Sequence, residues 1–156
     1  MLIMKIVLLV CAASMLCCLL LPSCNDKINV NQQVDFSLEC WHLQNTIGID
    51  EEVELRLTLK RSADFEETDY YIGYIQLAGQ GVLYDREETI LENRELYELT
   101  SIAELDRRNP CRQQFTLFYR NTANKSPEIQ IVVVDSFGQE RTLNVRFNVE
   151  GKIEGS

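Results

Sequence analysis

Hydrophobic and polar residues alternate along several segments of this chain. In residues 52–61, four aliphatic residues occupy every second position, and charged or polar residues fill the positions between them. The same period of two runs through residues 34–43 and 113–120. Successive side chains of a β-strand point to opposite faces, so this pattern predicts strands with one buried face.

The C-terminal part of the chain predicts a β-hairpin. Residues 128–135 are a nearly continuous run of Ile and Val, and residues 140–149 alternate again. Between them lies a four-residue turn in which Gly138 is available for a positive φ angle. Two strand-like runs joined by a short glycine-containing turn are typical of a hairpin.

Two further segments are apolar without a clear alternation. Residues 70–77 are rich in aromatic and β-branched residues, which favours a strand with both faces partly covered. Residues 85–110 allow two interpretations, because Leu, Glu and Arg are frequent and have high helix propensity. We predict a strand at residues 96–100; the alternative is a helical turn within residues 87–105.

Together these segments predict an all-β domain. Seven to eight short antiparallel strands are expected, with turn signals roughly every ten residues. No long helical periodicity and no internal repeat occur in the 156 residues. This combination favours a β-sandwich, in which two sheets bury their apolar faces against each other.

The first residues resemble a bacterial lipoprotein leader. Lys5 precedes an apolar run at residues 6–21, and Pro22 interrupts the run just before Cys24. These are the parts of a signal peptide, and the run is short for a membrane span, which needs about 20 residues. Residues 21–24 resemble the lipobox, whose final Cys is diacylated, although Pro22 departs from its usual pattern. We expect lipidation at Cys24; the alternative is an uncleaved anchor helix.

The leader divides the chain into four parts. Residues 1–23 are the predicted signal peptide, 24–33 a polar tether at the lipid anchor, 34–150 the β-sandwich domain and 151–156 a disordered tail. The net charge of −9 would repel nucleic-acid phosphates, so we expect no nucleic-acid binding. The simplest explanation of the acidic surface is solubility.

Two cysteines remain in the predicted domain. Cys40 and Cys111 would meet an oxidising compartment in an exported protein, where disulfides persist. They are candidates for a bridge that closes a long loop. The alternative is two separate thiols, one of them buried as a small hydrophobic residue.

Motifs of catalysis and metal binding are missing from the sequence. His42 is the single histidine, and no Cys-x-x-Cys pair, phosphate loop or zinc-protease helix occurs. The acidic clusters at residues 50–52, 64–69 and 85–88 lack the spacing of a calcium loop and are expected to be solvated. We therefore predict no catalytic residue, no metal, no cofactor and no enzymatic activity.

The aromatic residues of segment 70–77 predict a binding face. If Tyr71, Gly73 and the positions in phase with them face the core, then Tyr70, Ile72 and Tyr74 face outward. Tyrosine is enriched at interfaces because its ring is apolar and its hydroxyl polar. The alternative is that a second sheet or residues 85–110 cover this stripe.

Several short segments carry a resemblance to a known family. They are Cys24-Asn25-Asp26, residues 54–61, residues 71–74 with 79–83, and residues 135–139 before the last strand. With these segments the chain resembles the small lipoproteins of Bacteroides conjugative transposons, the TraQ-type conjugal transfer family. Residues 93–112, including Cys111, depart from the pattern, so the family implies no disulfide.

The resemblance implies an immunoglobulin-like sandwich, a role in conjugation and no known catalytic residue. The expected function is that of an accessory lipoprotein of a conjugation apparatus, held at the cell envelope, in the outer membrane, and acting by contact with other proteins of that apparatus. The alternative is a surface lipoprotein that binds glycans through the tyrosine stripe. Neither the partner nor the oligomeric state follows from the sequence.

Overall fold

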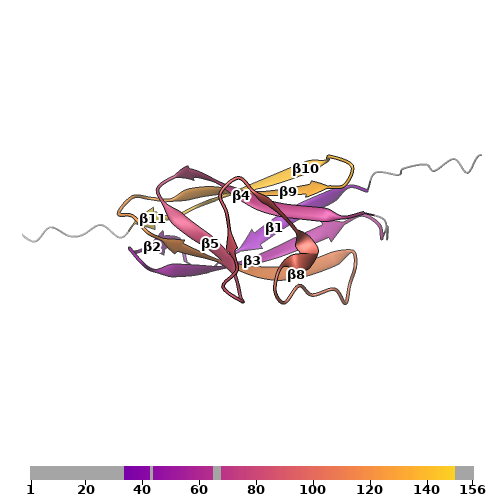
Figure 1. Cartoon of the computed structure of the whole chain (residues 1–156), viewed down its shortest axis with the longest axis horizontal. Coiled ribbons are helices and arrows are strands. Elements are labelled where there is room, and N and C mark those ends of the chain that lie inside the picture. Colours follow the sequence, from indigo (N-terminus) through magenta and orange to yellow (C-terminus); the bar gives the residue numbers. More distant parts are fainter. Residues whose placement is uncertain (1–33, 43, 65–67, 150–156) are drawn as a thin grey trace, which may run out of the picture. The chain divides into compact units, whose positions relative to one another are not determined.

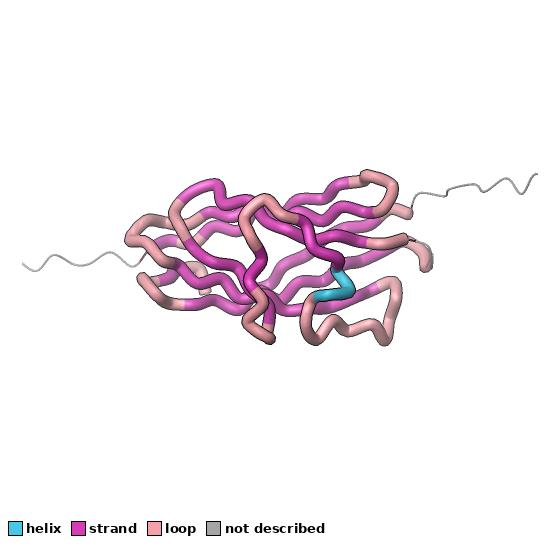
Figure 2. The backbone as a smooth tube through the Cα atoms, in the orientation of Figure 1, coloured by secondary structure: helices cyan, strands magenta, loops and turns pink. Residues whose placement is uncertain are grey.

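The computed structural model describes residues 34–42, 44–64 and 68–149 and shows an all-β protein. Figure 2 shows strand along most of this part of the chain, with one short helical turn, η2 (Leu99–Ser101). The strands are β1 (Phe36–Trp41), β2 (Thr46–Ile47), β3 (Glu52–Arg61), β4 (Tyr70–Ala78), β5 (Gly81–Asp85), β6 (Ile90–Leu91), β7 (Leu96–Glu98), β8 (Arg112–Asn121), β9 (Glu128–Asp135), β10 (Glu140–Arg146) and β11 (Asn148–Val149).

Two antiparallel sheets form the layers of a sandwich (Figure 1). The first has five strands in the order β1-β3-β8-β5-β6, and the second has four in the order β10-β9-β4-β7. A small third sheet pairs β11 with β2 in parallel. Three of the strands in the described residues, β2, β6 and β11, have only two residues each. The other eight match the seven to eight strands predicted from the sequence.

The core lies between the two large sheets. The alternation predicted for residues 52–61 is confirmed, because the four aliphatic side chains of β3 are at most 1% exposed. Burying apolar side chains from both layers is the main favourable contribution to folding a sandwich. The largest fully buried side chains are Tyr119, Phe147, Ile47, Leu55, Leu57, Leu59, Ile72, Leu83, Leu91, Leu117, Ile129 and Ile131.

The predicted C-terminal hairpin is present as β9 and β10. Gly138 has a φ of 82°, as expected for its turn. The prediction of one strand through residues 140–149 is wrong beyond Arg146, however. Phe147 is 1% exposed and lies between β10 and β11, which belong to different sheets. The chain leaves the four-stranded sheet at Phe147, and the next two residues pair with β2 instead.

The prediction for residues 96–100 is correct for three residues only. Leu96–Glu98 forms β7 and pairs with β4, whereas Leu99 begins η2. Leu99 and Ile102 are both buried, at 2% and 5% exposure. A 3₁₀ turn places residues three apart on the same side, so it brings both side chains into the core, which continued strand could not do.

Candidate functional site

The tyrosine stripe predicted as a binding face is buried. Tyr70, Ile72 and Tyr74 are 5%, 0% and 4% exposed. Their side of β4 faces the core, where Tyr70 packs edge-on against Phe36 with ring centroids 5.1 Å apart. The predicted orientation of β4 was therefore inverted, and the alternative of coverage by a second sheet is correct. A glycan-binding site on this stripe is excluded by the same burial.

The predicted disulfide between Cys40 and Cys111 is also wrong: both are free thiols. Cys40 pairs with Leu57 across β1 and β3, whereas the carbonyl of Cys111 accepts a hydrogen bond from Arg61 N, four residues farther along β3. Cys40 and Cys111 also lie on opposite sides of β3. Strand spacings place their Cα atoms about 16 Å apart, and a disulfide needs less than about 7 Å. Burial raises the pKa of Cys40 to about 11, as expected for a thiol packed as a small hydrophobic residue.

A different surface gathers the side chains expected of a binding site. It lies on the outer side of the five-stranded sheet, where alternate residues of β1, β3, β5 and β8 point away from the core. We call it the aromatic–arginine face. Its residues are Trp41, Glu52, Glu54, Arg56, Tyr84, Arg86, Phe118 and Arg120.

Trp41 is the most exposed aromatic side chain of this face. It ends β1 and pairs with Arg56 of β3. The Trp41 side chain is 53% exposed, and the Arg56 guanidinium lies 5.1 Å from the centre of the indole ring. A guanidinium at this distance is attracted to the electrons of the ring, which orients both side chains.

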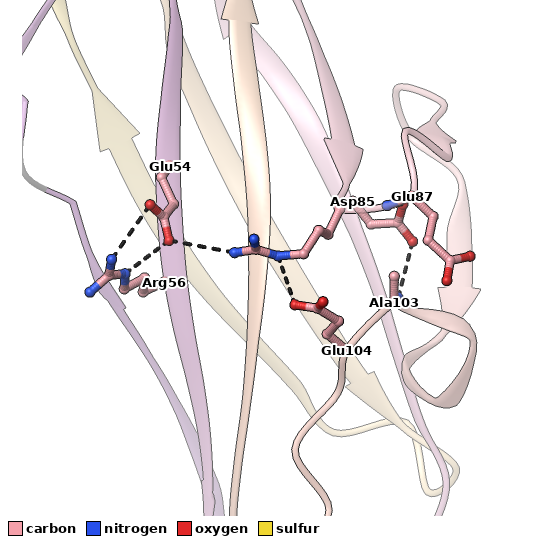
Figure 3. A network of polar contacts seen from close by, with 7 residues as sticks. Glu54, Arg56, Asp85, Glu87, Ala103 and Glu104 are labelled. Carbon is pink, nitrogen blue, oxygen red and sulfur yellow. Dashed lines mark hydrogen bonds and ion pairs between the residues drawn. The ribbon is translucent and has the colours of Figure 1, made fainter.

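Glu54 connects Arg56 to Arg86, in the turn after β5. Arg56 Nε donates to Glu54 Oε1 over 2.9 Å, and Arg86 Nη2 reaches the same oxygen at 4.0 Å. Arg86 Nε also pairs with Glu104 at 2.7 Å (Figure 3). The guanidinium of Arg86 lies 5.5 Å from the ring centre of Phe118. A single chain of contacts therefore crosses β3, β8 and the turn after β5.

The far end of the face is built on Tyr84. Its ring stacks on Phe118 with centroids 5.8 Å apart, and its hydroxyl donates to Glu52. The hydrogen bond from Tyr84 lowers the pKa of Glu52, whereas burial raises the pKa of Tyr84. Arg120 Nη2 donates to Tyr84 Oη over 3.1 Å, and its guanidinium lies 5.2 Å from the ring centre. Glu52 is thus held as a carboxylate between a hydroxyl and a guanidinium.

These exposed ion pairs contribute little to folding, since each is worth about 0–1 kcal/mol. Their effect is to hold long side chains in defined positions. Side chains that are ordered before binding lose less conformational entropy when a partner arrives. The network is therefore better explained as a binding surface than as a means of stabilising the sheet.

Three neighbouring hollows run across the face. One of about 270 Å³ is lined by Trp41, Glu54, Arg56 and Phe118 among others. It shares Trp41 and Arg56 with a hollow of about 570 Å³. At its other end it shares Glu52 and Phe118 with a hollow of about 150 Å³ beside Tyr84. The shared residues place the three hollows in a row over β1, β3, β8 and β5, and we call this row the groove.

Behind the groove, a buried carboxylate supports the face. Asp85 is 2% exposed, and its oxygens accept hydrogen bonds from the backbone N–H groups of Glu87, Thr89 and Ala103 over 2.9–3.0 Å. Figure 3 shows Asp85 beside Ala103 and Glu87. The prediction that the acidic cluster at residues 85–88 is solvated is wrong for Asp85. The backbone bonds position the turn that carries Arg86.

Comparison with known proteins supplies the family. A family model described as TraQ conjugal transfer protein matches residues 5–150. The chain belongs to the TraQ family. This membership gives the protein a role in conjugal transfer, and the family is not a known enzyme family. No curated protein gave a match.

Solved structures of Bacteroides proteins resemble this TraQ-family chain. A conjugative transposon lipoprotein from Bacteroides eggerthii is 27% identical, with a TM-score of 0.60 over 72% of this chain and 96% of that chain. A lipoprotein from Bacteroides thetaiotaomicron is 29% identical, with a TM-score of 0.59 over 83% and 92%. A conjugate transposon protein from Bacteroides vulgatus is 27% identical, with a TM-score of 0.59 over 84% and 96%.

Some predicted features of this TraQ-family chain are not tested by the structure. Cys24 and the leader lie outside the described residues.

No helix within the described residues is long and apolar enough to cross a membrane. Among residues 34–42, 44–64 and 68–149, no three His, Cys, Asp or Glu side chains gather into a group that could hold a metal ion. His42 packs against Phe147, and its Nδ1 lies 2.7 Å from the Gln44 carbonyl oxygen.

The aromatic–arginine face could have been predicted from the sequence, from aromatic residues on the polar side of two amphipathic strands. The alternation of β8 puts Phe118 on the polar side of its strand, and that of β1 does the same for Trp41. A large aromatic residue on the polar side of an amphipathic strand is unusual for a solvated surface. Two such residues on strands of the same sheet indicate a binding face.

Proposed function

We propose that this protein is an accessory lipoprotein of a conjugative transfer apparatus. It is anchored through a lipid on Cys24 to the outer membrane of the cell envelope. It acts there by protein–protein contact through the aromatic–arginine face. Membership of the TraQ family supports the role in transfer, and the lipobox-like residues 21–24 support the anchor, as do the two similar Bacteroides proteins described as lipoproteins.

One observation carries the contact mechanism: Trp41 is 53% exposed within an ordered set of aromatic and Arg side chains. Trp, Tyr and Arg are the residues that most often dominate the energy of protein–protein interfaces. An exposed indole packed against the fixed guanidinium of Arg56 has the composition of such a centre. A solvated sheet surface would instead carry small polar and flexible charged side chains.

Conjugal transfer frequency from donor cells tests this proposal. Donors in which the gene is replaced by a Trp41→Ala or an Arg56→Glu variant should transfer at least about tenfold less often, because loss of a central interface Trp costs about 2 kcal/mol or more in binding. Both positions are exposed, so folding should change by no more than about 0.5 kcal/mol.

The matched control is Arg146→Glu. Arg146 pairs with Glu128 on the outer side of the four-stranded sheet, away from the aromatic–arginine face. It should leave transfer unchanged at equal protein level. A Cys24→Ser variant tests the anchor separately, because it should move the protein out of the outer-membrane fraction. Normal transfer with Trp41→Ala would refute contact through this face, and normal transfer after deletion of the gene would refute the role itself.

A further inference from the structure

The largest hollow of the groove has a charge opposite to that of the whole chain. We call it the Trp41 hollow; it has a volume of about 570 Å³ and is lined by Glu39, Cys40, Trp41, Arg56, Thr58, Arg112 and Gln114. It contains two guanidinium groups and one carboxylate. That carboxylate, on Glu39, already accepts from Lys60 Nζ over 2.6 Å. Arg56 is likewise paired with Glu54, so the charge left over in the Trp41 hollow is the positive one of Arg112, in a protein whose net charge is −9.

Two arginines line this hollow from opposite ends. Arg112 pairs with Lys60 across β8 and β3, and Arg56 pairs with Thr116, so both project from the outer side of the sheet. Arg56 uses Nε and Nη2 toward Glu54, which leaves its Nη1 edge available to the hollow. No ion pair to Arg112 occurs among the described residues. Arginine donors of this kind bind carboxylates with directional hydrogen bonds.

The geometry points to an acidic segment of the partner protein in the Trp41 hollow. A carboxylate of that segment forms ion pairs with Arg112 and Arg56, and an apolar side chain next to it lies against the indole of Trp41. This inference rests on the proposed function and names the chemistry of the partner. The row of hollows over β1, β3, β8 and β5 fits an extended segment better than a single small ligand.

An anionic membrane surface fits less well. Binding to anionic lipid headgroups uses clusters of four to eight Lys and Arg side chains. On this face the carboxylates of Glu39, Glu52 and Glu54 alternate with the basic side chains, so a flat anionic surface would meet carboxylates as well as arginines. A polypeptide can place its carboxylates at the arginines and keep its backbone clear of the glutamates.

Intrinsic tryptophan fluorescence measures binding in this hollow directly, because Trp41 is the only tryptophan of the chain. The full-length protein is titrated with a short synthetic peptide of alternating Glu and Leu while Trp41 fluorescence is recorded. Matched peptides carry Lys or Gln in place of Glu, and phosphatidylglycerol vesicles serve as the lipid probe. The Glu peptide should produce a saturable change in emission that weakens at high salt, since exposed ion pairs are screened.

An Arg112→Gln variant should weaken the affinity for the Glu peptide by about three- to fivefold, as expected for the loss of one exposed ion pair. The Arg146→Gln variant, altered on the opposite sheet, should bind as the unmodified protein does. The inference would be overturned by any of three results. The Gln or Lys peptide could bind as tightly as the Glu peptide, the Glu peptide could give no response, or the fluorescence could respond to the vesicles and not to the Glu peptide.

The two proposals fail in different ways. If transfer depends on Trp41 while the Glu peptide does not bind, contact through this face is supported, and the inference that the partner segment is acidic is wrong. If the Glu peptide binds selectively while transfer does not depend on Trp41, the hollow binds acidic segments but the proposed contact through this face during transfer is wrong.

Discussion

Glu88 occupies a backbone conformation that normally favours glycine. Its φ is 62°, and Gly138 has a φ of 82° at the corresponding position of another hairpin turn. In both turns an Asp carbonyl accepts from the residue three positions on, and the Asp N–H donates to the carbonyl four positions on. The β5–β6 and β9–β10 hairpins therefore use the same turn, with glycine in only one of them.

We predict that Glu88→Gly stabilises the protein by about 1 kcal/mol. A residue with a Cβ atom pays a steric penalty of about 1–2 kcal/mol in the left-handed region, and the greater flexibility of glycine when unfolded offsets part of the gain. The free energy of unfolding in urea measures the change. Glu87→Gly is the control: Glu87 does not have a positive φ, so it should lose stability. Destabilisation by both variants would contradict the argument.

At the scale of elements, one buried carboxylate connects the β5–β6 turn to the segment after η2. Asp85 Oδ1 accepts from Glu87 N and Thr89 N, and Oδ2 accepts from Ala103 N. These donors come from segments that share no strand pairing with each other. Asp135 has a similar role, because it binds Gln139, whose side-chain amide reaches the carbonyl of Val34.

Replacing Asp85 by Ala should cost about 3 kcal/mol, because several buried backbone N–H groups lose a charged acceptor. The loss should appear in urea unfolding and as faster hydrogen exchange of the Ala103 amide. Glu104→Ala removes an exposed partner of Arg86 in the same network and should change stability by less than about 1 kcal/mol. Similar costs for the two variants would show that the buried bonds do not have this role.

At the scale of the whole molecule, Tyr119 joins the two sheets. It lies on β8, is fully buried, and accepts a hydrogen bond over 3.0 Å from Gln76 Nε2 on β4. Gly81 makes room for it, since a Cβ atom there would lie 2.2 Å from the Tyr119 hydroxyl. The ring also stacks on Phe147 at 6.1 Å. Packing and hydrogen bonding at this residue thus depend on both layers being in place.

Tyr119 predicts a loss of stability in alkali. Burial raises its pKa to about 12, whereas an unfolded tyrosine ionises near pH 10. The folded state keeps a proton that the unfolded state releases, so stability is complete below about pH 10 and falls by about 2 kcal/mol toward pH 12. Urea unfolding at several pH values should show a shallower fall for Tyr119→Phe than for the unmodified protein. An identical slope would contradict the assignment.

The sequence alone was sufficient for the strands that are amphipathic. Where one side of a strand is apolar and the other polar, as in β3 and β8, burial follows from the alternation because a strand has a period of two. The same pattern made the sandwich class predictable. In β4, apolar or aromatic residues occupy both sides, so periodicity could not decide which side faces the core.

Only the tertiary structure could decide what distant residues do together. The aromatic–arginine face combines residues of β1, β3, β5 and β8, and it forms because strand register places Trp41 beside Arg56 and Phe118 beside Tyr84. Register also keeps Cys40 away from Cys111. Alternation records only which side of its own strand a residue occupies. Neighbours across a sheet depend on strand order and register, which the packing of the whole core selects.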